Sequence, residues 1–558
     1  MIHLLSPRRT KRVVLVALSA LVTTTAGIAA DEASVTHLVP SGGQQGKTVE
    51  VVLRGTLNGG DKRKAWSSHP GIVVTFAKKT DRVQVAIKAD VPPGRYFLRF
   101  SNAGAASSLL PFFVSPIDEV NEVEPNGKLP EAQKLAGMAR VINGVLSESR
   151  DVDVFEVAMK SGQTLVASMM ANTELGSPMD GLLQVVSEKG FVVAQDDDSL
   201  GLDPFVTFTA PGDGRFFVRT FAFPAKTNST IGLASGSDFV YRLTVTTGPY
   251  VDFTIPSAFS KKKPGRLAVK GWNLPKEHRE WLIDPMAHGV DGRFYRQGWN
   301  NTVPLKAVTH DVATELEPNG RKKPQRVSVP TTLTGTIGND KDRDVFEIEA
   351  KKGSALEIAV ESRRLGFPLD PVIRVSDGTG KVLKETDTRS ADKVDEAISW
   401  SPPTSGTFRV EVRDLFEHGG PRFVYRLTIQ PQPVAVSATV EKDVLPLDGG
   451  KPLEVKVTIN RSGGFDKAVR LELENPFEGI VAKPVTSEPK GPTAKTVTLK
   501  LERKEGVKDV QGGPLKIVGR VEGMAEPVTI VTAPVPRLTE RSGNLWLIVK
   551  PMSKPKKK

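Results

Sequence analysis

Cysteine is absent from the 558 residues, and long apolar runs are scarce. Without cysteine the chain forms no disulfide, no thiolate metal site and no lipid-anchored lipoprotein N-terminus. The apolar run at residues 13–22 is short for a bilayer span, and no later stretch is apolar enough to cross one. Blocks of Ala, Leu, Glu and Lys that would favour long helices are also scarce. These absences argue against a membrane protein and against a helical bundle.

Catalytic signatures are equally scarce. The chain has seven histidines and no H-E-x-x-H motif, so it shows no ligand set for a zinc hydrolase. It has no G-x-S-x-G elbow, and no basic stripe interleaved with aromatic residues that would indicate nucleic-acid binding. Scattered Ser, His and Asp residues leave a hydrolase of another kind open. The leading interpretation is nevertheless a protein without catalytic activity that binds no nucleic acid.

The two ends of the chain carry the most uneven charge. Arg8, Arg9, Lys11 and Arg12 precede the apolar run, and small residues then lead to Ala30. This layout predicts a signal peptide at 1–30 and export to the periplasm, the cell surface or the exterior, with no transmembrane segment after cleavage; an uncleaved anchor is the alternative. The tail 550–558 holds five of the lysines that contribute to the net charge of +12. It is predicted to be disordered and able to touch anionic surfaces, or else simply to be solvated.

Glycine and proline are abundant, with 50 and 41 residues, and Thr and Val recur between them. Many short segments alternate apolar and polar residues, as in Val345–Glu349 and Leu453–Ile459. This pattern predicts an all-β chain of tandem β-sandwich modules, jelly-roll-like and immunoglobulin-like.

A repeat divides the chain. The motif NEVEPNG at 121–127 is followed by a D-V-F strand start at Asp153, by Asp180, by Asp197 and by G-R-F at Gly214. The motif TELEPNG at 314–320 is followed in the same order, at nearly the same spacing, by Asp344, Asp370, Asp387 and Gly406, and the run F-V-Y-R-L-T closes each copy. A shared order of six landmarks predicts a duplicated domain.

The repeat sets the predicted domain boundaries. The two copies are 118–247 (the first repeat) and 313–431 (the second repeat), and the segments around them read as further sandwiches. The full prediction is a signal peptide at 1–30, an immunoglobulin-like sandwich at 31–117, the first repeat at 118–247, a small β module at 248–312, the second repeat at 313–431, an immunoglobulin-like sandwich at 432–549 and a basic tail at 550–558.

The landmarks of the repeat resemble the bacterial pre-peptidase C-terminal domain. That domain carries an E-x-E-P-N motif, a D-x-D-x-F strand start, an L-D-P strand, an acidic loop and a final Y-x-L strand. The second repeat matches with Leu369–Pro371 and Tyr425–Leu427, whereas the first departs with Met179-Asp-Gly181. The resemblance implies jelly-roll-like sandwiches that accompany secreted peptidases, bind a substrate polymer in collagenases and hold calcium in some members. Residues 31–117 resemble the TIG type of immunoglobulin-like domain through Val39-Pro-Ser-Gly-Gly43 and Gly94-Arg-Tyr96.

The repeated acidic motif is the best candidate site. Calcium requires six to eight oxygen ligands, and alternate residues of an extended strand point to one side. If the following loop folds back, two aspartates join each motif. The predicted ligands are Glu122, Glu124, Asn126, Asp151 and Asp153 in the first repeat, and Glu315, Glu317, Asn319, Asp342 and Asp344 in the second. Arg150 and Arg343 lie in the same loops and could neutralise the carboxylates in place of a metal.

These observations predict an exported, non-catalytic protein that recognises a protein or polysaccharide of the envelope or matrix, with calcium as a candidate cofactor. A secreted peptidase, or an accessory subunit of one, is the alternative. A structural spacer without a ligand is the third interpretation.

Overall fold

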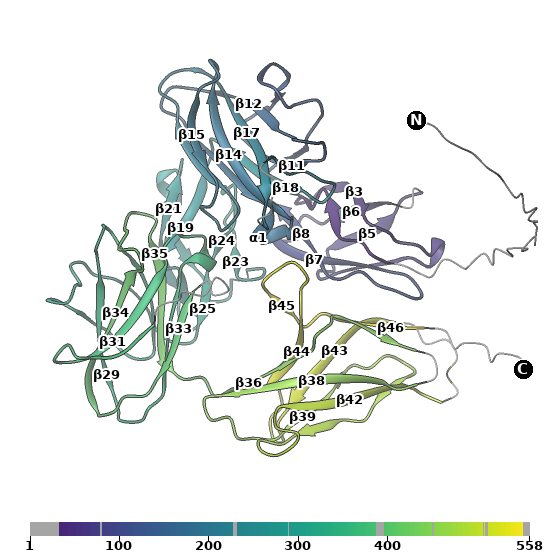
Figure 1. The fold of residues 1–558 in the computed structure, drawn as a ribbon, viewed down its shortest axis with the longest axis vertical. Coiled ribbons are helices and arrows are strands. Elements are labelled where there is room, and N and C mark those ends of the chain that lie inside the picture. Colours follow the sequence, from purple (N-terminus) through teal and green to yellow (C-terminus); the bar gives the residue numbers. More distant parts are fainter. Residues whose placement is uncertain are drawn as a thin grey trace, which may run out of the picture. The chain divides into compact units, whose positions relative to one another are not determined.

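The computed structural model describes residues 33–78, 81–226, 232–287, 289–386, 395–448, 451–505, 507 and 512–550. The predicted signal peptide, the tail beyond residue 550 and the landmark Asp387 lie outside these residues. Figure 1 shows strands throughout the described part, so the all-β prediction is confirmed. Among the described residues, no helix has the length and apolar character needed to cross a membrane.

The N-terminal segment forms two four-stranded sheets, in the orders β1-β3-β6-β5 and β2-β8-β7-β4. Both sheets contribute side chains to one core, which includes Val51, Val85, Leu98 and Phe112. The elements are β1 (His37–Val39), β2 (Gly42–Gln44), β3 (Thr48–Arg54), η1 (Gly60–Lys62), β4 (Lys64–Ser67), β5 (Ile72–Phe76), β6 (Arg82–Ile87), β7 (Gly94–Ser101) and β8 (Leu110–Ser115).

The first repeat forms two five-stranded sheets, in the orders β10-β12-β17-β14-β15 and β16-β13-β18-β11-β9. Its elements are β9 (Glu119–Asn121), η2 (Leu129–Glu131), β10 (Gln133–Lys134), β11 (Ala139–Val145), β12 (Asp153–Met159), β13 (Thr164–Met170), α1 (Asn172–Leu175), β14 (Met179–Ser187), β15 (Val192–Asp196), β16 (Phe205–Thr209), β17 (Gly214–Pro224) and β18 (Val240–Thr246). Alternate residues such as Phe155 and Val157 on β12, and Leu165 and Ala167 on β13, meet in one core between the sheets.

The second repeat has the same strand order. Its sheets run β27-β29-β34-β31-β32 and β26-β28-β35-β30-β33. The elements are β26 (Val312–Thr314), β27 (Gln325–Arg326), β28 (Thr331–Thr336), β29 (Asp344–Ala350), β30 (Leu356–Glu361), η4 (Arg363–Leu365), β31 (Pro371–Asp377), β32 (Val382–Thr386), β33 (Glu396–Trp400), β34 (Gly406–Asp414) and β35 (Val424–Pro431). Taken in chain order, each strand from β26 to β35 occupies the place of the strand from β9 to β18 in the first repeat.

Between the repeats lies a smaller arrangement of sheets, in the orders β19-β21-β22, β20-β25 and β23-β24. Trp299 is buried there in T-shaped contact with Trp281, at 5.2 Å between ring centroids. The elements are β19 (Tyr250–Ile255), β20 (Ala258–Ser260), β21 (Gly265–Trp272), η3 (Lys276–His278), β22 (Glu280–Ile283), β23 (Arg293–Phe294), β24 (Val303–Pro304) and β25 (Lys306–Val308).

The C-terminal segment forms eleven connected strands around one core. Buried and exposed residues alternate along β38, as expected for a strand with one face toward that core. The elements are β36 (Ala435–Thr439), β37 (Val444–Leu447), β38 (Leu453–Ser462), β39 (Val469–Glu474), β40 (Ile480–Ala482), β41 (Val485–Ser487), β42 (Thr496–Arg503), β43 (Gly513–Arg520), β44 (Thr529–Pro534), β45 (Arg541–Ser542) and β46 (Leu545–Val549). The predicted domain boundaries between these segments stay predictions.

An ion pair at the end of β30 predicts a pH-dependent stability. Glu361 accepts hydrogen bonds from Arg426 at 3.0 Å and Lys306 at 2.9 Å. Burial alone would raise the pKa of Glu361, but the two cations outweigh it and lower that pKa to about 2. The pair therefore stabilises the fold above the unfolded-state pKa of ~4.3, and the stabilisation is lost as the pH falls toward 2.

We expect Glu361→Gln to lower the free energy of unfolding by about 2 kcal/mol at pH 7, because two partly buried cations lose their partner. The difference from the unmodified protein should shrink at pH 3. Urea denaturation at both pH values measures it, with the exposed Glu349→Gln as the control. A difference that is the same at both pH values would contradict the assignment.

Candidate functional site

The acidic motif of each repeat forms a loop after a short strand. In the first repeat β9 ends at Asn121, and residues 122–127 (the first acidic loop) follow it; in the second repeat β26 ends at Thr314, and residues 315–320 (the second acidic loop) follow. The peptide bonds before Pro125 and Pro318 are both cis. The motif is therefore not the continuous extended strand that the alternation of its oxygens assumes. The ladder hydrogen bonds end at the first glutamate, where the amides of Glu122 and Glu315 donate to the carbonyls of Asn143 and Thr334 at 3.0 and 3.1 Å.

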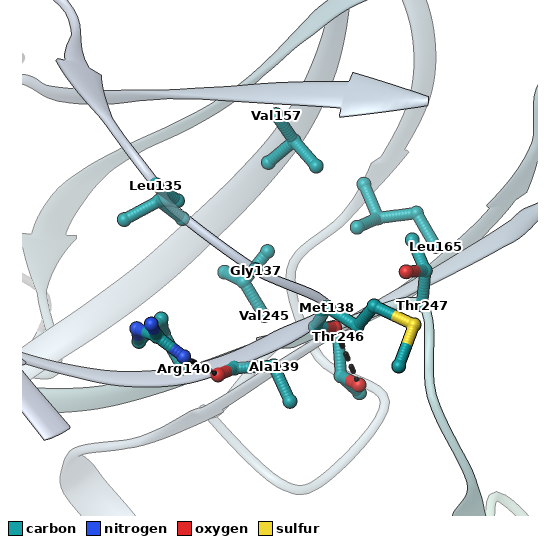
Figure 2. A pocket seen from close by; sticks show the side chains of 10 residues that line it. All are labelled: Leu135, Gly137, Met138, Ala139, Arg140, Val157, Leu165, Val245, Thr246 and Thr247. Atoms are coloured by element: carbon teal, nitrogen blue, oxygen red, sulfur yellow. Dashed lines mark hydrogen bonds between the residues drawn. The ribbon is translucent and has the colours of Figure 1, made fainter. Parts of the chain in front are cut away.

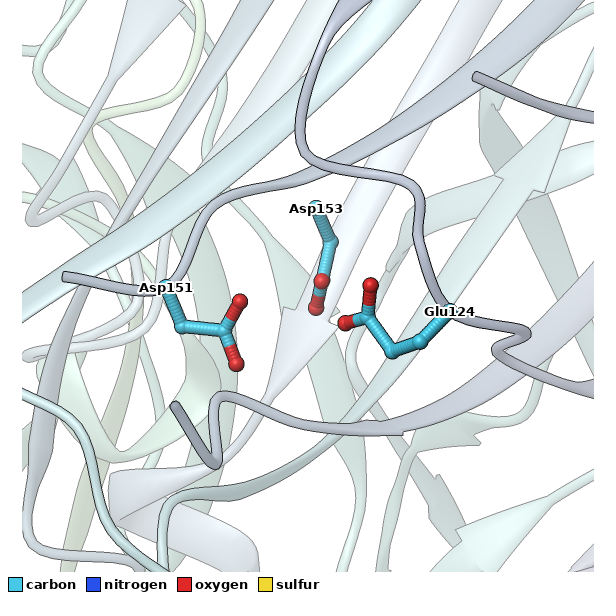
Figure 3. Close-up of side chains that lie close together, drawn as sticks. All are labelled: Glu124, Asp151 and Asp153. Atoms are coloured by element: carbon cyan, nitrogen blue, oxygen red, sulfur yellow. The ribbon is translucent and has the colours of Figure 1, made fainter. Parts of the chain in front are cut away.

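Three of the five predicted residues in the first repeat come together. Carboxylate oxygens of Glu124, Asp151 and Asp153 all lie within 4.8 Å of one another. Figure 3 shows the three carboxylates turned toward a common point, Glu124 from the acidic loop and the two aspartates from the chain that leads into β12. The chain before β12 thus folds back onto the acidic loop, as predicted.

The remaining two predicted residues border this cluster. Glu122 accepts the Val145 amide at 2.8 Å and the Tyr241 hydroxyl at 3.1 Å. That hydroxyl also donates to Asp153, so Glu122 and Asp153 share one donor. Asn126 is fully buried within the loop.

In the second repeat a slightly different set of three carboxylates comes together. Carboxylate oxygens of Glu315, Glu317 and Asp344 lie within 4.8 Å of one another. Asp342 stands at the edge of this group, where its two oxygens accept the backbone amides of Gly338 and Arg343, each at 2.8 Å. Asp151 accepts amides in the same manner in the first repeat, from Glu148 and Val152 at 3.0 Å.

Several buried polar atoms at both sites lack a hydrogen-bond partner among the described residues. In the first repeat they are Oδ1 of Asp153 and both amide atoms of Asn126; in the second they are Oδ1 of Asp344, both amide atoms of Asn319 and Oε2 of Glu315. A buried polar atom without a partner costs about 1–3 kcal/mol. The aspartate oxygen and both amide atoms of the asparagine are unsatisfied at the same places in both repeats, whereas Oε2 of Glu315 is unsatisfied in the second repeat alone.

The local electrostatics are unfavourable to so many negative charges. Burial raises the pKa of Glu122, and the charge of Asp153 raises it further. Burial is also the main cause that raises the pKa of Asp153, Glu315 and Asp344. A cation held among these oxygens would offset both effects, since it supplies opposite charge and occupies lone pairs.

Arg150 and Arg343, the arginines of the two loops, do not supply positive charge to these carboxylates. Arg343 pairs with Glu411 at 3.2 Å and with Glu417 at 2.6 Å, both outside the predicted ligand set. Arg150 is exposed and forms no ion pair within the part of the chain that is described. The arginine alternative is therefore wrong for the geometry observed.

Two tyrosines belong to the site, although their sequence pattern predicts core packing alone. Tyr241 and Tyr425 are buried in the two cores. Their hydroxyls, however, donate to Asp153 and Asp344, each at 2.6 Å. The sequence contains one signal for this role. Both copies of the F-V-Y-R-L-T run have Tyr at the same place, although Phe would pack equally well if packing were the only requirement.

Two glycines make room for these contacts. A side chain built on Gly144 would overlap the Tyr241 hydroxyl and the Glu122 carboxylate. A side chain on Gly335 would overlap Tyr425 and Glu315 in the same way. Each glycine pairs directly with the tyrosine across β11–β18 or β28–β35. The close approach of tyrosine, carboxylate and backbone thus depends on the missing Cβ atom.

A separate pocket in the first repeat is too small for a ligand. It lies at the end of β11 and is lined by residues that include Leu135, Met138 and Arg140 (Figure 2). Its cavity volume is about 10 Å³, which is room for one water molecule at most. Arg140 and Thr246 donate to the carbonyls of Ala139 and Met138 there, the two bonds drawn in Figure 2.

Comparison with known proteins gives partial similarities. No family model matches the chain. A probable subtilase-type serine protease from Deinococcus radiodurans is 31% identical over 104 residues, which are 18% of this chain and 14% of that protein. The chain therefore matches only a small part of that relative's length.

Solved structures resemble the chain at low identity. The pre-peptidase C-terminal domain of a Bacillus anthracis collagenase is 12% identical, with 20% of this chain and 98% of that domain covered and a TM-score of 0.16. The glucan utilization protein SGBP-B of Bacteroides ovatus, solved with a heptasaccharide, is 10% identical over 72% of this chain and 77% of that one, with a TM-score of 0.14. Similarities at these TM-scores carry no functional argument.

Removing the tyrosine hydroxyl should destabilise each repeat. We expect Tyr241→Phe and Tyr425→Phe each to lower the free energy of unfolding by about 1–3 kcal/mol, because a buried carboxylate loses its donor while ring packing is retained. Chemical denaturation measures the change in each variant. In each variant the repeat that keeps its tyrosine is the control for the repeat that loses it. Unchanged stability in either variant would show that the hydroxyl is not required.

Proposed function

We propose that this protein is an exported, non-catalytic binding protein of the cell envelope or exterior, in which each repeat holds one calcium ion at its acidic loop. The observation that carries the calcium assignment is the duplicated set of buried oxygens without partners, on Asp153 and Asn126 and on Asp344 and Asn319. Such oxygens are the hard ligands that calcium selects.

The residues fit the ion in number and kind. In the first repeat the carboxylates of Glu124, Asp151 and Asp153 and the amide oxygen of Asn126 would hold it, with Glu122 beside them. In the second repeat Glu315, Glu317, Asp344 and Asn319 would hold it, with Asp342 beside them. Water could supply the remaining ligands that calcium takes.

The ion would join the acidic loop to the start of β12 or β29. Backbone amides of Asn126 and Asn319 already donate to Glu124 and Glu317, which fixes the loop in a turn. A cation would tie this turn to Asp153 or Asp344 on the sheet, and so make the beginning of each repeat rigid. Rigid β modules in series suit the recognition of an extended polymer or a protein surface.

The recognition role rests on the modular all-β fold and on the signal-peptide pattern of the sequence. The partner class we propose is a protein or polysaccharide of the envelope or matrix. A second candidate is an accessory subunit of a secreted peptidase, which the partial similarity to a probable subtilase-type protease favours.

Calcium should stabilise the protein through both repeats. We expect a chelator to lower the melting temperature, by the equivalent of about 2.7 kcal/mol per site when calcium had been one hundredfold above its Kd. Calorimetry should find two sites in the unmodified protein, one in Glu124→Ala or Glu317→Ala, and none in the double variant.

The control is Glu188→Ala, which removes an exposed carboxylate that pairs with Arg215 at the other end of the sheet. Its melting temperature should respond to the chelator as the unmodified protein does. A melting temperature that ignores the chelator would refute the calcium assignment.

The binding role can be tested separately. We expect residues 31–558 to be retained by at least one insoluble envelope or matrix polymer, peptidoglycan and collagen among those tried, and more strongly with calcium than with chelator. Retention is measured by co-sedimentation, and peptide hydrolysis is assayed in the same fractions. Hydrolysis of a peptide substrate by the purified chain would overturn the non-catalytic assignment.

A further inference from the structure

The small module between the repeats begins with the same pairing of strands as the N-terminal segment. β1 pairs antiparallel with β3, with Val39 opposite Val52, and β19 pairs antiparallel with β21, with Ile255 opposite Ala268. Both members of the second pair lie 216 residues after their counterparts in the first. Because register is set independently in each pair of strands, an identical offset on both strands indicates that the two hairpins correspond residue by residue.

A parallel pair of strands follows at corresponding places. The carbonyl of Ser41 accepts the amide of Phe113 at 2.9 Å, next to the first residue of the parallel pair β2–β8. The carbonyl of Ser257, again 216 residues after its counterpart, accepts the amide of Lys306 at 3.2 Å, next to the parallel pair β20–β25. The middle module is therefore a shortened form of the N-terminal one.

The connection from each module to its repeat is also the same length. Six residues separate Phe113 on β8 from Glu119 on β9, and six separate Lys306 on β25 from Val312 on β26. The offset between the two connections is 193 residues, which is also the offset between the two acidic motifs. The duplication thus extends beyond the repeats and includes the module before each of them.

Arg242 lies where the first repeat meets its module. It follows Tyr241 on β18, so its side chain leaves the opposite face of the sheet from the core, and yet it is only 3% exposed. The guanidinium donates to both oxygens of Glu119, at 2.7 and 2.9 Å. It lies 5.9 Å from the ring centroid of Phe113, and a Cβ atom on Gly42 would overlap its Nη1 atom. Residues of the module therefore cover this arginine.

Arg426 has the same position in the second closing run and also contacts the preceding module. It is 6% exposed. Its Nε atom donates to Glu361 and its Nη1 atom donates to the carbonyl of Ser257, each at 3.0 Å. The amide of Ser257 in turn donates to the hydroxyl of Thr334 at 2.7 Å, on the strand that pairs with β35. The second repeat is thus bonded to its module in both directions.

The carboxylate that balances the arginine does not keep its place. In the first repeat it is Glu119 on β9, where the second repeat has Val312. In the second repeat it is Glu361 on β30, where the first repeat has Met170. The arginine is common to both repeats although its counter-ion is on a different strand in each. What the two arginines share is the contact with the module before the repeat.

We propose that the arginine of the F-V-Y-R-L-T run is a coupling residue that seats each repeat on the module before it, and that the chain contains two copies of this two-module unit, at 37–246 and 250–431. Modules of one chain move relative to each other unless their interface opposes it. A buried guanidinium that bonds both sides of the junction supplies that opposition, because charge-assisted hydrogen bonds are strong where water is excluded. Each unit therefore moves as one body.

Hydrogen exchange, measured by mass spectrometry on residues 31–558, tests the coupling. We expect Arg426→Met to speed amide exchange in peptide 253–260 at least about tenfold, because the junction opens more often when the bond across it is lost. Exchange in peptide 39–45 should stay unchanged in that variant. Arg242→Met should do the reverse, so each variant is the control for the other junction.

Two further variants separate coupling from the stability of the repeat itself. Arg326→Met removes an arginine of the second repeat that is 72% exposed, and it should leave exchange at both junctions unchanged. Arg426→Lys keeps a positive charge beside Glu361 but lacks the planar group that bonds two acceptors. We expect it to speed exchange in peptide 253–260 while β29, in the core of the repeat, exchanges as in the unmodified protein.

Two outcomes would overturn the proposal. One is unchanged exchange at the junction peptides in both methionine variants. The other is an increase that is equally large in β29 and in peptide 253–260 for both substitutions of Arg426, since the arginine would then stabilise its own repeat without coupling it to the module.

Discussion

The burial of negative charge at the start of one strand is the constraint around which each repeat is arranged. Asp153 and Asp344 open β12 and β29 and have no solvent exposure. Each has a donor on the core side, which a tyrosine hydroxyl supplies, and each faces acidic side chains from the loop that follows the first strand of the repeat. A glycine opposite the tyrosine gives the space for both. Without the hydroxyl the buried carboxyl group loses its donor, and a Cβ atom on the glycine would overlap the tyrosine.

The two repeats keep this interior and differ outside it. Strand order, the tyrosine, the glycine and the unsatisfied asparagine recur in both. On the outer side, the second repeat carries the ion pairs around Glu385 and Glu411, whereas the first has Gln195 and Arg219 at the corresponding places. Core residues are constrained by packing on all sides, whereas an outward residue meets only solvent or a partner.

Comparison with other proteins agrees with a modular chain. The similarity to a probable protease covers 104 residues, which is a small part of either protein.

The all-β class, the repeat and most of the candidate ligands can be predicted from the sequence, because alternation of apolar residues and the spacing of landmarks are properties of the chain. Three findings needed the folded structure: the acidic motif is a loop, Arg343 pairs with Glu411 and Glu417, and Tyr241 and Tyr425 bind carboxylates through their hydroxyls. These contacts join residues up to 119 positions apart. Local pattern carries no information about such distances, since the packing of two sheets brings the partners together.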